Sequence, residues 1–79
     1  MSGEALGDVV RVANTLRRVR FEKRITQKEL HEKSGVSQRT IRHLEKHDEV
    51  VPTDGTLFPL ADALEVDPAW LLAEFKSAA

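Results

Sequence analysis

Apolar residues recur at helical spacing along the chain, a pattern that predicts five helices and no strands. The first helix is expected to begin at an Asp8 N-cap and to run to about Lys23. Its inward stripe consists of Val9, Val12, Ala13, Leu16, Val19 and Arg20. Arg20 is the only charged member of that stripe. The pattern as a whole predicts an all-α fold, a compact bundle of five helices.

Residues 26–46 are predicted to form two short helices joined by a tight turn. Thr26 followed by Glu29 matches a capping box at the start of one helix, Gly35 can end it, and Ser37 can cap the next helix through Leu44 or beyond. The residues expected to point inward are Leu30, Val36, Ile41 and Leu44, and those left outside on the second helix are Gln38, Arg39, Arg42 and His43. This geometry allows the second helix to enter a DNA major groove.

The last two helices have different start signals. Pro59 is expected in the first turn of the fourth helix, where a residue needs no amide donor. The inner side of that helix is predicted to contain Leu60, Ala61, Leu64 and Val66. Asp67 followed by Pro68 indicates an N-cap and first helical position for the fifth helix.

The length allows one domain, so residues 1–79 are expected to form a single unit with the two-helix motif at about 26–46. The absence of cysteine excludes a disulfide framework and a thiolate metal site. The N-terminus lacks the basic start of a secretory signal, and the apolar runs are too short to span a membrane. We therefore expect a cytoplasmic protein that has no membrane contact.

The net charge of −1 conceals a strong segregation of charge. Residues 11–46 hold eleven Lys and Arg against four Glu, or +7, whereas residues 47–79 hold one Lys against seven acids, or −6, and residues 1–10 add −2. A positive field over the first three helices favours a polyanionic partner, and the acidic half would face away from it or toward another protein.

An ordered set of motifs from Leu16 to Leu72 resembles the helix-turn-helix domain of the phage repressor and Cro class, the xenobiotic-response-element-like family. The motifs are LRRVR, ITQKEL, SGVSQRTI, HLE, LADALEV and WLL. The family usually has a small residue at the position of His31 and often an apolar one at Ser34, so we expect slightly weaker packing in the turn. The acidic loop at 48–55 stands where the closest repressors place cations.

The resemblance implies a DNA-binding surface centred on the second helix of the motif. Glutamine pairs with the adenine edge and arginine with that of guanine, so Gln38 and Arg39 are expected to read bases, with Arg42 and His43 one turn later. The position of Gln27 binds a phosphate in the family and can brace the glutamine at 38. The residues expected near phosphates are Arg17, Gln27, Lys28, Ser37 and Thr40.

Two further expectations also come from the resemblance. Arg20 matches an arginine that pairs with the glutamate ending the recognition helix, here Glu45, so the two are expected to form a structural ion pair. The dimer contact is expected on the last helix and on the loop between the third and fourth helices. On the last helix we predict Trp70 in the core and Leu71 and Phe75 in an exposed apolar patch.

The sequence therefore predicts a DNA-binding transcriptional regulator, a repressor acting as a homodimer on a palindromic operator, without catalysis, cofactor, metal or small-molecule ligand. His43 and His47 have the spacing of two metal ligands, but no third ligand is apparent at a sensible spacing. The alternatives that stay open are an antitoxin, the controller of a restriction system, and a protein-binding adaptor on the same fold.

Overall fold

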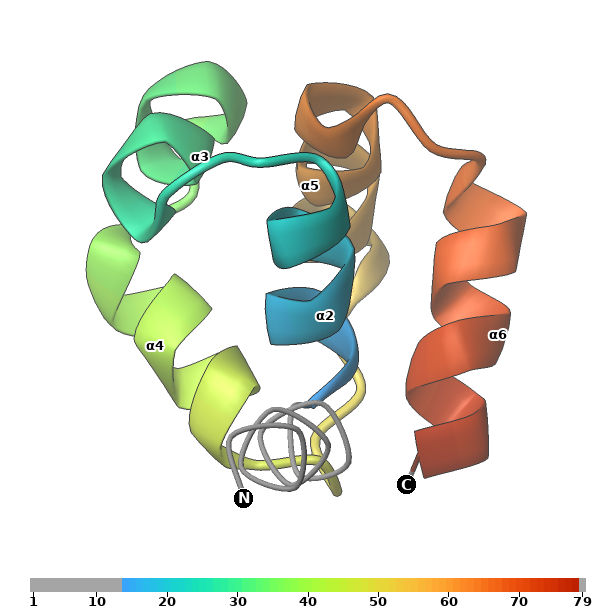
Figure 1. Cartoon of the computed structure of the whole chain (residues 1–79). Coiled ribbons are helices and arrows are strands. Elements are labelled where there is room, and N and C mark those ends of the chain that lie inside the picture. Colours follow the sequence, from blue (N-terminus) through green and yellow to red (C-terminus); the bar gives the residue numbers. More distant parts are fainter. Residues whose placement is uncertain (1–13, 79) are drawn as a thin grey trace, which may run out of the picture.

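The computed structural model describes residues 14–78, which fold into helices only (Figure 1). Its helices are α2 (Thr15–Glu22), α3 (Gln27–Ser34), α4 (Gln38–Lys46), α5 (Asp54–Leu64) and α6 (Pro68–Ala78). Helix α2 packs against α4 on one side and α6 on the other, while α5 packs against α3 and α6. The predicted all-α class is confirmed, and no strand occurs between residues 14 and 78.

The first predicted helix does not run unbroken to Lys23. Asp8 lies outside the described residues, but Asn14 has an extended backbone (φ −75°, ψ 171°), so no helix continues through it into Thr15. The Asn14 side chain caps α2 instead, with Oδ1 accepting a hydrogen bond from the Arg17 N–H at 2.9 Å. Its Nδ2 donates to the carbonyl of Leu44, near the end of α4. The buried amide of Asn14 thus joins the beginning of α2 to the end of α4.

The predicted limits of α3 and α4 are confirmed by their caps. The Thr26 hydroxyl accepts a hydrogen bond from the Glu29 N–H at 3.0 Å, and a Glu29 carboxylate oxygen accepts one from the Thr26 N–H at 2.9 Å. The bond from the Thr26 N–H to the carboxylate is the main cause that lowers the pKa of Glu29 below its ordinary value, and the Thr26 side chain adds to this effect. Gly35 follows in the left-handed conformation (φ 76°), and the Ser37 hydroxyl accepts from the Thr40 N–H at 3.1 Å.

The turn between α3 and α4 is closed by two polar side chains. The Nδ1 of His31 lies 2.8 Å from the carbonyl oxygen of Val36, which can only accept, so Nδ1 carries the proton. The Ser34 hydroxyl accepts a hydrogen bond from the Val36 N–H at 3.0 Å. The two residues expected to weaken the packing of the turn therefore hold it through hydrogen bonds.

Helix α5 begins earlier than the position of Pro59 suggested. It starts at Asp54 after an extended Thr53, which leaves Pro59 inside the helix rather than in its first turn. Pro59 has no N–H to donate to the carbonyl four residues earlier, which belongs to Gly55. Because Gly55 is exposed near the start of the helix, that carbonyl is accessible to water, and the helix tolerates the loss.

The buried core is made by all five described helices. Its members are Leu16, Val19, Leu30, Ile41, Leu44, Leu57, Leu60, Ala61, Leu64, Leu71 and Phe75. Val66, expected on the inner side of the fourth helix, lies beyond its end and packs against the core only partly.

The predicted orientation of the last helix is wrong. Leu71 and Phe75, expected in an exposed patch, are 0% and 2% exposed, whereas Trp70, expected in the core, is 42% exposed. Residues four apart share one side of a helix, so Leu71 and Phe75 turn inward together and Trp70 is rotated away from them. In this orientation the Glu74 carboxylate of α6 lies 2.9 Å from Arg18 on α2, with which it forms an ion pair.

Replacing Asn14 tests its double role. Asn14→Ala removes the cap of α2 and the donor to Leu44, and should lower the free energy of unfolding by about 1–3 kcal/mol in a urea titration. Asn14→Ser restores a good N-cap but cannot reach Leu44, so its unfolding midpoint should lie between those of wild type and Asn14→Ala. A serine variant as stable as wild type would show that the contact with α4 contributes nothing.

Candidate nucleic-acid interface

Helix α4 has one buried and one exposed face. Ile41 and Leu44 lie in the core, which directs the opposite side of the helix to solvent. Three of the four predicted base-reading residues, Arg39, Arg42 and His43, are exposed, and Gln38 is half-buried at the first turn. The exposed face of a short helix at the corner of the fold is the part that a DNA groove can accommodate.

The predicted phosphate-binding residues differ in how far their polar groups are already engaged. The Ser37 hydroxyl caps α4 and also donates to the Thr40 hydroxyl at 3.0 Å, so the Thr40 proton is the one left to donate outward. Lys28 and Arg17 are exposed. Gln27 and Lys28 also lie in the first turn of α3, where backbone N–H groups have no partner within the helix.

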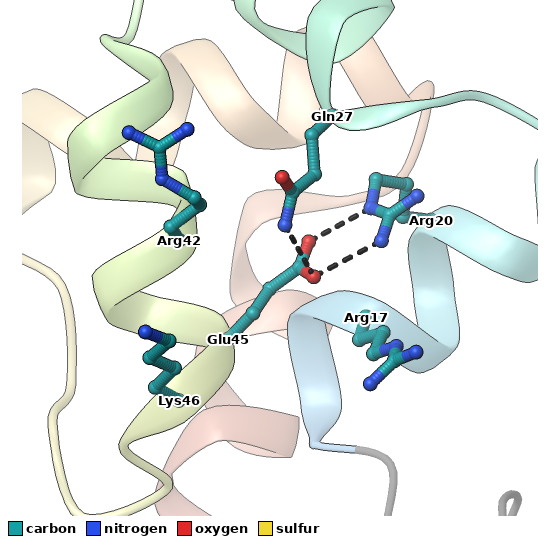
Figure 2. Close-up of a pocket in the computed structure, with 6 residues that line it drawn as sticks. All are labelled: Arg17, Arg20, Gln27, Arg42, Glu45 and Lys46. Atoms are coloured by element: carbon teal, nitrogen blue, oxygen red, sulfur yellow. Dashed lines mark hydrogen bonds and ion pairs between the residues drawn. The ribbon is translucent and has the colours of Figure 1, made fainter.

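Three helices meet at the carboxylate of Glu45 (Figure 2). Arg20 on α2 donates to both oxygens of Glu45, from Nε at 2.8 Å and from Nη2 at 3.0 Å, and the two side chains are only 9% and 5% exposed. Gln27 on α3 donates from Nε2 to the same carboxylate at 3.1 Å. The remaining Arg20 nitrogen, Nη1, donates to the carbonyl of Ile25 at 3.1 Å. The structure thus brings Arg20 and Glu45 together in a buried, bidentate pair.

Gln27 has a different partner from the one expected. Its amide nitrogen is directed to Glu45, and no hydrogen bond joins it to Gln38 among the described residues. Lys46 and Phe21, which the sequence interpretation did not single out, also lie beside this cluster. Their place beside the cluster could not be predicted from the sequence, because it depends on how α2 packs against α4.

The histidines do not form a metal site within residues 14–78, where no group of three potential ligands is found. The rings of His43 and His47 lie against each other with centroids 4.7 Å apart. His47 is also 3.5 Å from the Glu49 carboxylate in the acidic loop. His31 is half-buried, and its Nδ1 is hydrogen-bonded to the carbonyl of Val36 in the turn.

The half of the fold made by α5 and α6 is acidic and carries exposed aromatic rings. Phe58 and Trp70 are 53% and 42% exposed. A shallow groove of about 190 Å³ between the two helices is lined by Asp54, Leu57, Phe58, Pro68, Ala69 and Leu72. This surface differs in charge and polarity from the exposed face of α4. The contrast follows the segregation of charge seen in the sequence.

The class of the protein follows from its family. A family model described as helix-turn-helix matches residues 16–71, and the chain belongs to this family, the Cro/C1-type helix-turn-helix proteins. Its members are DNA-binding transcription regulators. No curated protein and no solved structure is significantly similar to the chain. None of the described helices has the length and hydropathy needed to cross a membrane.

A double-mutant cycle measures the coupling between Arg20 and Glu45. Arg20→Met or Glu45→Leu alone leaves the other charge buried without its main partner, which should cost roughly 3 kcal/mol of unfolding free energy. The double variant should be more stable than the sum of the single losses implies, by about 1–3 kcal/mol. Urea unfolding of the four proteins gives the values, and additive losses would show that the pair is not coupled.

Proposed function

We propose that this protein is a sequence-specific regulator of transcription, a repressor that binds a palindromic operator as a homodimer, with residues 1–79 as its single domain. The observation that carries the proposal is the exposed face of α4, where Arg39, Arg42 and His43 stand on the second helix of a helix-turn-helix pair. Membership in a family of DNA-binding regulators supports the same conclusion. No cofactor, metal or catalytic step is part of this function.

Base reading is assigned to the first turn of α4. In this docking geometry the N-terminal residues of the recognition helix reach deepest into the major groove. Gln38 can pair with an adenine edge and Arg39 with a guanine, and His43 lies one turn later on the outward face. Lys28, the first turn of α3 at Gln27, and the Ser37 and Thr40 hydroxyls at the start of α4 are placed to meet the sugar-phosphate strand that borders the groove.

Dimerisation is assigned to the α5–α6 surface rather than to Leu71 and Phe75, which are buried. Phe58 and Trp70 are large and exposed, and Phe58 lines the apolar groove. Exposed aromatic rings of this size are typical of protein interfaces. One recognition helix reads only a few base pairs, so a second copy is the partner that doubles the site.

The role of Gln38 is tested on an operator selected from a random duplex library. Gln38→Ala should lower the affinity for that operator by about 1–3 kcal/mol and relax discrimination at one base pair in each half-site, because a bidentate contact is lost. Competition over all four bases at each position gives the specificity profile. Lys28→Ala is the control, because loss of a phosphate contact lowers affinity for all sequences alike. An unchanged profile for Gln38→Ala would remove Gln38 from the reading surface.

The dimer contact is tested with Phe58→Glu. Since Phe58 is half exposed, the protomer should stay folded, while sedimentation should show weaker self-association and DNA titration a parallel loss of operator affinity. Lys76→Gln on α6 changes the net charge by the same amount and should leave both unaffected. A wild-type protein that is monomeric both free and on a full operator would contradict the homodimer. If Phe58→Glu dimerises normally, the dimer contact lies elsewhere on the protein, and the α5–α6 surface would instead bind another protein, as in an adaptor.

A further inference from the structure

A polar pocket of about 260 Å³ opens between α2, α3 and α4, beside the exposed face of α4 (Figure 2). Its lining residues are Arg17, Arg20, Gln27, Arg42, Glu45 and Lys46. The buried cluster of Arg20, Gln27 and Glu45 lies at its centre. In Figure 2, Arg42 and Lys46 lie on one side of that cluster, on α4, and Arg17 lies on the other, on α2.

The only carboxylate in this pocket is already neutralised. Both oxygens of Glu45 accept hydrogen bonds from Arg20, and one of them also accepts from Gln27. Four cationic residues and one acid line the pocket, so 4 − 1 leaves a formal charge of +3. An anion entering the pocket would therefore meet uncompensated positive charge rather than a competing carboxylate.

The pocket has three cations at its rim, Arg17, Arg42 and Lys46. Arg17, Arg42 and Lys46 are exposed, and none of them makes an ion pair with any residue between 14 and 78. Arg18 provides the contrast, because it faces the other way and binds Glu74 at 2.9 Å. Cations gathered with no acid to balance them stabilise a bound anion, and guanidinium groups match the oxygens of phosphate.

Phe21 explains how Arg17 is held near the pocket. Its ring is 48% exposed and has no place in the core, yet the Cζ atoms of Arg17 and Arg20 lie 5.2 and 4.9 Å from its centroid. At these distances the ring face attracts both guanidinium groups. Because Arg20 is fixed by Glu45, the ring fixes Arg17 relative to the pocket as well.

We propose that this pocket binds one phosphate of the DNA backbone through Arg17, Arg42 and Lys46, with Phe21 as a positioning residue for Arg17. The proposal rests on the proposed DNA-binding function and changes one of its assignments, since Arg42 then contacts a phosphate and not a base. When Arg39 and His43 on the outward face of α4 enter a groove, the pocket at the side of α4 faces the strand that borders that groove.

The assignment of Arg42 is tested on the selected operator and on a duplex of unrelated sequence. Arg42→Gln should weaken binding to both about tenfold, leave the base-preference profile unchanged, and reduce the slope of log affinity against log salt by about one per protomer. Lys76→Gln removes the same charge from α6 and should change neither. A base preference altered at one operator position by Arg42→Gln would place Arg42 on a base edge and overturn the pocket, while the DNA-binding function would stand.

Neutralising single phosphates of the operator locates the ligand. One methylphosphonate substitution per half-site should weaken wild-type binding about as much as Arg42→Gln does, and should have no further effect on that variant. If every such substitution weakens wild type and Arg42→Gln equally, no phosphate occupies the pocket.

The role of Phe21 is tested with two variants. Phe21→Leu should lower the affinity for DNA about threefold without moving the urea unfolding midpoint. Phe21→Tyr should keep the wild-type affinity, because only an aromatic ring holds Arg17.

Inorganic phosphate separates failure of the pocket from failure of the proposed function. In an NMR titration at constant ionic strength, phosphate but not chloride should shift the Arg17 and Arg42 Nε–H resonances of wild type, and Arg42→Gln should abolish the Arg17 shift. If wild type binds no duplex but shows these shifts, the proposed function fails and the pocket is a site for free phosphate. If the shifts are absent, the pocket proposal fails even where duplex binding persists.

Discussion

The buried ion pair between Arg20 and Glu45 fixes how the exposed helix α4 sits on the rest of the protein. Apolar packing is not directional, so the core alone leaves room for rotation and sliding of α4 against α2. A bidentate pair permits little of either, because both Arg20 nitrogens must keep their distances of 2.8 and 3.0 Å to the Glu45 oxygens. Gln27 and the carbonyl of Ile25 satisfy remaining polar groups, which offsets much of the cost of burying two charges.

The same pair determines the electrostatics of the candidate interface. A free carboxylate at position 45 would neutralise the neighbouring cations and repel phosphate. Once its oxygens are occupied by Arg20 and Gln27, the cations around it remain available to an external anion. The acidic residues on α5 and α6 lie on the other half of the fold, and the exposed rings of Phe58 and Trp70 lie there too. One half of the protein is therefore suited to a polyanion and the other to a protein surface.

Signals that act within a few residues could be predicted from the sequence. The capping box of Thr26 and Glu29, the left-handed Gly35 and the Ser37 cap depend on local backbone geometry, and the structure has all of them. The predictions that failed concern features that depend on packing between residues distant in the sequence. The cap at Asn14 was missed because its side chain also donates to the Leu44 carbonyl, a contact that depends on the packing of α2 against α4. On α6, Trp70, Leu71 and Leu72 are consecutive apolar residues, so their order alone could not show which one faces α2 and α5.

Arg42 shows the limit of sequence interpretation at the site itself. Residues three and four apart share one side of a helix, so Arg42 lies on one edge with Gln38, four residues before it, and with Glu45, three residues after it. The position of Gln38 suggests that Arg42 faces the DNA groove, whereas that of Glu45 suggests that Arg42 faces the rest of the protein. Helical spacing alone cannot decide between these two orientations. The choice depends on what covers Glu45. Because α2 and α3 both reach that carboxylate, the edge carrying Arg42 borders their pocket, and its charge belongs with Arg17 and Lys46 rather than with Arg39.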